Sequence, residues 1–207
     1  MSTAVKAGPK TSGVPFKPEM VRALRAGRKT MTRRLVKPQP TWEPVGYDHG
    51  HWACEDGEWS YLGRFRDGGH RPVCGPFRPP FGNVGDRIYV KEATYRDADG
   101  MARYVADDAA VMCELGPAPW TWKPSTLASM YMPRWAARDY RDVVGLRVER
   151  LNDISEADAV AEGVEADQGH GLTAFGKFSL LWDSINGSGS WYRNELVWVY
   201  SLSGMED

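Results

Sequence analysis

The sequence has few cysteines, no long apolar run and almost no net charge. Its three cysteines, Cys54, Cys74 and Cys113, cannot all pair, and its N-terminus lacks the apolar core of a signal peptide, so we expect reduced thiols and a cytoplasmic location. The apolar runs are only a few residues long, against about 20 for a membrane helix, so we expect no membrane contact. The 26 basic and 27 acidic residues give a net charge of −1, which excludes a global attraction to nucleic acid.

Glycine and proline are abundant instead, with 22 and 14 residues in a chain of 207. At about 150 residues per domain, a chain of this length and composition fits one large, loop-rich domain. We expect residues 1–14 to be a flexible arm and residues 15–207 to be a single domain. Two stretches without a steady hydrophobic period, about 41–82 and 107–140, are predicted insertions that stand outside its central sheet.

Hydrophobic spacing and turn residues predict several short elements. Helices are expected at 18–26, 155–163 and 175–185, and strands at 29–36, 87–95, 102–106, 143–150 and 196–202. Short alternating strands that lie far apart in the sequence favour a small curved sheet with helices at its ends. The predicted class is α+β, with the strands in a partly closed barrel.

The charges are segregated along the chain. Residues 20–40 contain seven cations and no acid, and residues 151–176 contain six acids and no Lys or Arg. The acidic run is best interpreted as a solvated face. The basic run interrupts positions that look buried, so it is either a solvated edge strand or part of a functional site.

One motif lies within this basic run. Gly27 ends the predicted helix, Lys29 follows two residues later, and Thr32 and Arg34 lie on the predicted strand. This segment resembles the signature of the ASCH family of the PUA-like superfamily. Weaker matches follow in the same order, and they are found at residues 85–90, 147–156, 161–163 and 197–200. Residues 122–125, 132–136 and 181–187 resemble a longer subgroup found in phage and prophage genomes.

The resemblance implies a PUA-like barrel with a cleft that binds a nucleoside or single-stranded nucleic acid, without a cofactor. Some small members of the family are amidohydrolases that remove the acetyl group from N4-acetylcytidine with a Lys, a Thr and a Glu. Lys29 and Thr32 match two of these residues directly, and Glu162 is the nearest match to the third. Arg28, Arg33 and Arg34 would contact the ligand. The present chain is about twice as long as those enzymes.

The chemistry of these residue types agrees with such a role. A threonine hydroxyl is a weak nucleophile until a base removes its proton, and a neutral lysine is such a base. At an unperturbed pKa of about 10.4, only about one lysine in 2,500 is neutral at pH 7. Neighbouring arginines would lower the pKa of Lys29, whereas Glu162 would raise it. Because residues three apart on a strand face opposite ways, we expect Lys29 at the helix–strand junction.

Three interpretations stay open from the sequence: catalysis, binding without catalysis, and a phage structural or protein-interaction module that kept only the fold.

Two further groups of residues could bind a metal or a base. The first is a set of possible zinc ligands whose spacing matches no firm pattern, so that no metal is the favoured interpretation: His49, His51, Cys54, His70 and Cys74. The second is formed by Trp120, Trp122 and Trp135, which either stack on a base or, as we favour, anchor their loop to the core.

Overall fold

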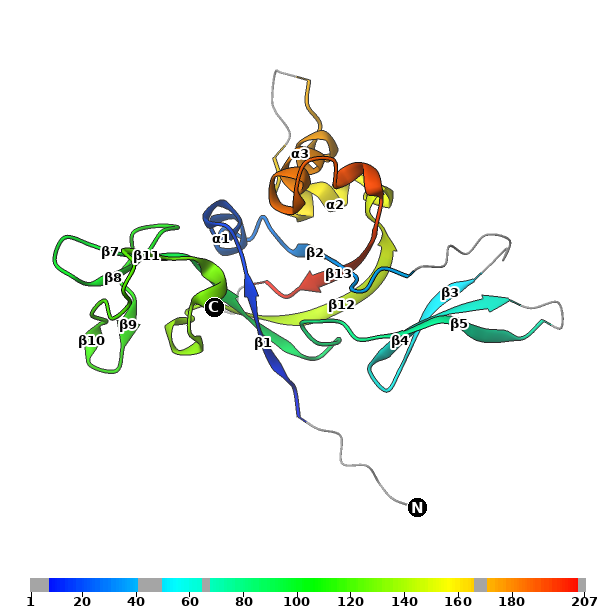
Figure 1. Cartoon of the computed structure of the whole chain (residues 1–207), viewed down its shortest axis with the longest axis horizontal. Helices are drawn as coiled ribbons and strands as arrows, with labels where there is room; N and C mark the ends of the chain where they lie inside the picture. Colours follow the sequence, from blue (N-terminus) through cyan, green and yellow to red (C-terminus); the bar gives the residue numbers. More distant parts are fainter. Residues whose placement is uncertain (1–7, 41–49, 65–67, 166–170, 205–207) are drawn as a thin grey trace, which may run out of the picture.

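A five-stranded sheet forms the centre of the computed structural model, which describes residues 8–40, 50–64, 68–165 and 171–204 (Figure 1). Its strands, in spatial order, are β1 (Thr11–Pro15), β6 (Arg87–Lys91), β12 (Tyr140–Arg150), β13 (Leu196–Leu202) and β2 (Met31–Leu35). Strand β1 pairs with β6 in parallel, and the other pairs are antiparallel. In the described chain the edge strands β1 and β2 do not pair, so the sheet is not a closed barrel.

Three α-helices accompany this sheet in the part of the chain that the structure describes. Helix α1 (Pro18–Arg25) joins the two edge strands, whereas α2 (Glu156–Ala161) and α3 (Ala174–Asn186) lie together over β2 and β13 (Figure 1). One core cluster contains Val21 and Leu24 of α1 with Trp198 and Tyr200 of β13. A second cluster places α2 and α3 against the opposite face of β13. The sheet is therefore buried on both faces near β2.

Strands outside the central sheet form separate small sheets, which include the described strands of both predicted insertions. One has the order β3 (His51–Glu55), β4 (Glu58–Arg64) and β5 (His70–Phe77), and another has the order β11 (Thr126–Leu127), β7 (Thr94–Arg96) and β8 (Ala102–Tyr104). Strands β9 (Met112–Cys113) and β10 (Gly116–Pro117) pair with each other. The described residues also form four short 3-10 helices, namely η1 (Ser129–Tyr131), η2 (Arg134–Ala136), η3 (Leu151–Asp153) and η4 (Trp191–Arg193).

The α+β class and most predicted elements are confirmed. The helices expected at 18–26, 155–163 and 175–185 are α1, α2 and α3, and the final strand has the predicted bounds of 196–202. The described parts of 41–82 and 107–139 add no strand to the main sheet, and β12 begins at Tyr140, the last residue of the second predicted insertion. Residues 41–49 and 65–67 of the first insertion lie outside the described residues.

The predicted flexible arm is wrong for its last residues, because Thr11–Pro15 form strand β1. Residues 1–7 lie outside the described residues. The strand was missed because Val14 is its one strongly apolar residue, while Gly13 looks like a loop residue. Gly13 is required by packing instead, since a Cβ atom there would lie 2.4 Å from the ring of Tyr89. The glycine at position 13 therefore serves the close approach of the Tyr89 ring and not the flexibility of the chain.

The strand expected at 87–95 is two strands, and the strand expected at 102–106 does not belong to the central sheet. The chain leaves β6 after Lys91, and Thr94–Arg96 pairs with Ala102–Tyr104 in the sheet of β11. Buried Glu92 marks the transition, where its carboxylate receives two hydrogen bonds from Arg138. Alternation of apolar residues indicates a strand but not the sheet that contains it.

Strand β1 yields a first prediction. Val14 is 1% exposed in the main core, so Val14→Ala should lower the free energy of unfolding by about 2 kcal/mol through lost burial and a residual cavity. Lys10→Ala, at an exposed neighbouring position, should change it by less than about 0.5 kcal/mol. Urea denaturation followed by circular dichroism measures both values. Equal, negligible effects would show that residues 11–15 do not pair with the sheet.

Candidate functional site

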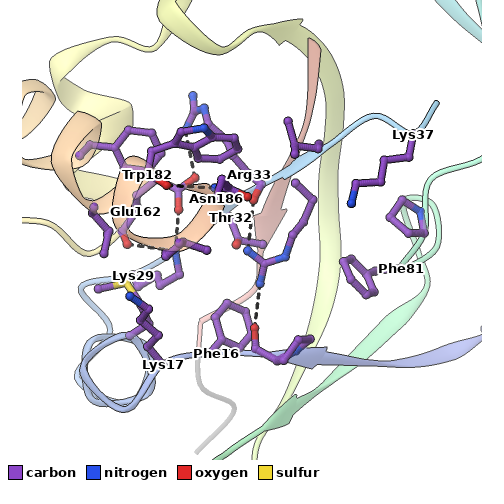
Figure 2. Close-up of a pocket in the computed structure, with 18 residues that line it drawn as sticks. Phe16, Lys17, Lys29, Thr32, Arg33, Lys37, Phe81, Glu162, Trp182 and Asn186 are labelled. Atoms are coloured by element: carbon purple, nitrogen blue, oxygen red, sulfur yellow. Dashed lines mark hydrogen bonds and ion pairs between the residues drawn. The ribbon is translucent and has the colours of Figure 1, made fainter. Parts of the chain in front are cut away.

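A cavity of about 390 Å³ lies beside the edge strand β2, between the end of β1 and helix α3 (Figure 2). It is lined by cations, by aromatic rings and by one carboxylate. The lining residues used below are Phe16, Lys29, Thr32, Arg33, Arg34, Phe81, Glu162, Phe178, Trp182 and Asn186. The structure thus brings the three predicted catalytic residues, Lys29, Thr32 and Glu162, to one cavity, although they come from different parts of the chain.

Lys29 lies between α1 and β2, as predicted. Its backbone N–H donates to the carbonyl oxygen of Ala23 in α1, and it forms a bridge with Glu162 at the end of α2. Its buried Nζ donates to the Glu162 Oε2 atom at 2.6 Å, to the Glu162 carbonyl oxygen at 2.9 Å and to the Met31 carbonyl oxygen at 2.7 Å. These three bonds use all three protons of an ammonium group.

Glu162 is brought to Lys29 by the close packing of two helix ends. It follows α2 as the C-cap residue, and Gly163 comes next with φ +87°. A Cβ atom at residue 163 would lie 2.9 Å from the Ala23 side chain and 3.0 Å from that of Lys29. Only glycine allows both this backbone conformation and this approach. The Ala161-Glu162-Gly163 segment therefore has a structural reason for its composition.

Arg33 fixes the other side of the Glu162 carboxylate. Its side chain is completely buried and donates to Glu162 Oε1 at 3.2 Å, to Glu149 Oε1 at 2.6 Å and to Asp158 Oδ2 at 2.7 Å. Arg147 bonds to Glu149 and Asp158 from their outer side. The resulting network connects β2, β12 and α2. Arg33 thus belongs to the cavity wall, and its guanidinium is already engaged.

Burial and charge act in opposite directions on these groups. Burial lowers the pKa of Lys29 below its ordinary value, against the opposing carboxylate of Glu162, and Arg34 and Arg33 add to the lowering. Burial also opposes the charge of Arg33, but Glu162, Glu149 and Asp158 outweigh it and raise its pKa. Arg33 therefore stays charged, whereas Lys29 gives up its proton more readily than an exposed lysine.

Thr32 and Arg34 project from the face of β2 opposite to Arg33, because successive strand residues alternate. Phe16 covers this face. The Lys29 Nζ atom lies 5.8 Å and the Arg34 guanidinium carbon 5.2 Å from the centre of the Phe16 ring. Thr32 is buried and precedes Arg34 by two residues on this face. Lys29 precedes the regular strand, so strand alternation does not hold its amine on the face opposite to the Thr32 hydroxyl.

Arg34 differs from Arg33 because it bonds only to main-chain carbonyls. It donates to Pro15 at 2.9 Å and to Arg33 at 3.1 Å, which connects the edges β1 and β2. Its guanidinium also lies 5.9 Å from the ring centre of Phe81. In the described part of the chain it has no ion pair. Burial lowers its pKa, with Glu162 opposing. Arg34 is thus a cation that a ligand anion or oxyanion would stabilise.

Other predicted ligand-binding residues lie elsewhere. Arg28 is half exposed, forms an ion pair with Glu165 and does not line the cavity. Trp122 packs on a further core cluster that contains Tyr104 and Met132, and its ring is nearly parallel to that of Trp135, 6.3 Å away. Neither lines the cavity beside β2. For Trp122 the anchoring interpretation agrees with the structure, whereas Trp135 is 54% exposed.

Among the residues with a described position, no group of three or more His, Cys, Asp or Glu is arranged to hold a metal ion. The rings of His51 and His70 are 5.1 Å apart across the sheet of β3, β4 and β5. Cys54 lies 3.9 Å from the Asn83 side-chain oxygen, and Cys74 lines a separate cavity of about 280 Å³. His49 lies outside the described residues.

The sequence did not identify the aromatic walls of the cavity. Phe16 was assigned to no element, and Phe178 and Trp182 were assigned to a helix without a functional role. Their i, i+4 spacing predicted one buried helix face, but not the edge strand that this face meets. Glu149 and Asp158 were likewise missed, because their contact with Arg33 depends on sheet register and on the position of α2.

No family model, curated protein or solved structure matches the chain. Membership of the ASCH family therefore stays a prediction from the motifs. No helix in the described ranges is long and apolar enough to cross a membrane. The site itself is consequently the main evidence on function.

The ion network gives a second prediction. Arg33→Met keeps much of the side-chain volume but leaves Glu149, Asp158 and Glu162 without their shared cation, which should cost about 3–5 kcal/mol of unfolding free energy. Arg28→Met is the matched control, because its ion pair is exposed and should be worth less than about 1 kcal/mol. Urea denaturation measures both. A loss for Arg33→Met no larger than that of the control would contradict the network.

Proposed function

We propose that this cavity binds a nucleoside and hydrolyses the amide of an N4-acylated cytidine, on a PUA-like, partly closed barrel of the ASCH type. The observation that carries this proposal is the convergence of Lys29, Thr32 and Glu162 on one cavity. They are the three residues to which the sequence resemblance assigned catalysis. Arg34 of β2 donates to Pro15 of β1 and so connects the two edge strands of the central sheet, which supports a partly closed barrel.

The size and charges of the cavity favour a nucleoside over a nucleic-acid strand. A volume of about 390 Å³ is near the lower end of the roughly 300–1,000 Å³ of small-molecule pockets. Two of the three arginines predicted to contact the ligand are neutralised by carboxylates, Arg28 by Glu165 and Arg33 by its network, so they are not free to bind the phosphates of a strand. Phe16 and Phe81 offer flat apolar surfaces beside Arg34. A module that kept only the fold would not need this cavity.

The residues divide the reaction as follows. When Lys29 has lost its proton to solvent, its neutral amine, held next to Glu162 at 2.6 Å, accepts the hydroxyl proton of Thr32. The Thr32 oxygen then bonds to the acyl carbon, and Arg34 stabilises the oxyanion. The bond between this carbon and N4 breaks, and the proton held by Lys29 passes to N4. Water, deprotonated by Lys29, then releases the carboxylic acid and restores Thr32.

The third prediction tests this nucleophile. Thr32→Val removes the hydroxyl at nearly constant shape and should lower kcat/KM for N4-acetylcytidine by about 10³-fold or more. Thr94→Val is the control, because Thr94 is equally buried in another sheet and its hydroxyl has no partner among the described residues. Released cytidine is measured by chromatography. Turnover that survives in Thr32→Val, or is absent from the parent protein, would refute the hydrolase.

The fourth prediction concerns pH. Protonated Lys29 cannot accept the Thr32 proton, so kcat/KM should rise with pH through the pKa of Lys29. Burial of Lys29 places this pKa below the ordinary lysine value of 10.5. A pH–rate profile with N4-acetylcytidine measures it. A rate that stays constant with pH, or a midpoint at or above 10.5, would contradict the assignment of Lys29 as the base.

A further inference from the structure

The residues that line the cavity beside β2 leave an excess of positive charge. The described lining contains one acid, Glu162, and five basic residues, namely Lys17, Lys29, Arg33, Arg34 and Lys37. Glu162, Glu149 and Asp158 compensate Lys29 and Arg33. The other three cations form no ion pair in the part of the chain that the structure describes. The proposed reaction uses only Arg34 among them, so two cations remain unexplained.

Lys37 is the cation that is free to bind a ligand. It follows the end of β2, is exposed, and forms no hydrogen bond, ion pair or ring contact within the described chain. Figure 2 shows its side chain extending into the cavity from the side on which Phe81 lies. Lys17, by contrast, precedes α1 and donates to the Ser184 Oγ atom of α3 at 3.2 Å. The two lysines therefore line the same cavity, but only Lys17 already has a partner.

The place of Lys37 along the chain fits the far end of the proposed substrate. In an N4-acylcytidine the acyl group and the ribose lie at opposite ends of the base, on N4 and N1. An extended chain rises about 3.3 Å per residue, so the α-carbons of Thr32 and Lys37 are at most about 17 Å apart. A lysine that reaches back along β2 brings its amine closer by the length of its side chain. A ligand that lies along β2 with its acyl group at Thr32 thus brings its ribose toward Lys37.

We propose that the substrate is a cytidine that carries a phosphate on its ribose, and that Lys37 binds this phosphate. The inference rests on the proposed function and names the substrate class of the same site. A phosphate monoester carries between one and two negative charges near pH 7, which a neutral nucleoside lacks. Lysine binds phosphate as a compact point charge with three donors. The free amine of Lys37 and the excess of positive charge then both have a ligand group to bind.

A binding experiment tests this without any catalytic step. Calorimetry measures the dissociation constants of cytidine, cytidine 5′-monophosphate and cytidine 3′-monophosphate for the parent protein, Lys37→Met and Lys17→Met. Lys17→Met is the matched control, because it makes the same change at a second lysine of the cavity lining. All titrations are repeated in about 0.5 M salt, which screens exposed charges. Urea denaturation of the three proteins measures the effect on folding.

The expected pattern is specific to a phosphate bound by Lys37. The parent and Lys17→Met should bind one of the two monophosphates about fivefold more tightly than cytidine, and less so in high salt. Lys37→Met should bind cytidine as the parent does and show no preference for the monophosphate. The monophosphate that the parent prefers identifies the ribose position that carries the phosphate.

The other outcomes separate this inference from the proposed function. Equal binding of all three ligands by the parent, or a preference that persists in Lys37→Met, overturns the phosphate inference while nucleoside binding stands. A preference that Lys17→Met loses as fully as Lys37→Met overturns the assignment to Lys37, because the excess charge as a whole would then cause it. If the parent binds none of the ligands, the proposed function fails and this inference fails with it.

Discussion

The buried contact between Lys29 and Glu162 is the interaction on which the site depends. It places two opposite charges in a low-dielectric interior, where desolvation is expensive and an ion pair needs further hydrogen bonds to persist. The protein supplies them through two main-chain carbonyls on Lys29 and through Arg33 on Glu162. Glu149 and Asp158 in turn balance Arg33. The site is thus a chain of compensated charges.

The position of β2 at the sheet edge explains why this chain of charges adjoins a cavity. Arg33 faces α2 and α3, whereas Thr32 and Arg34 face Phe16, so one strand contributes to both sides. With no strand paired beyond this edge in the described structure, the side chains of β1 and α3 close the space. An edge strand is usually a liability that must be covered. Here its cover also lines the proposed binding site.

Local patterns predicted the elements, but long-range contacts decided the site. Thr32 and Arg34 could be assigned to a strand, and Lys29 to its start, because alternation and Gly27 are local signals. The partners of Arg33 were out of reach, since Glu149 meets it only through the register of β2, β13 and β12. Strand β1 was missed because the glycine at position 13 is explained by its close contact with Tyr89, a residue far away in the sequence. The family resemblance suggested that Lys29 pairs with Glu162, and the structure shows the close packing of helix ends that brings the two residues together.

The most direct test of the account is to locate the acyl group during turnover. The protein is mixed with excess N4-acetylcytidine and quenched rapidly in acid, and its peptides are analysed by mass spectrometry. The account predicts an acetyl group on the Thr32 oxygen, because attack by a threonine forms a covalent ester. Cytidine release without any acetylated peptide, or with the acetyl group on another residue, would contradict it.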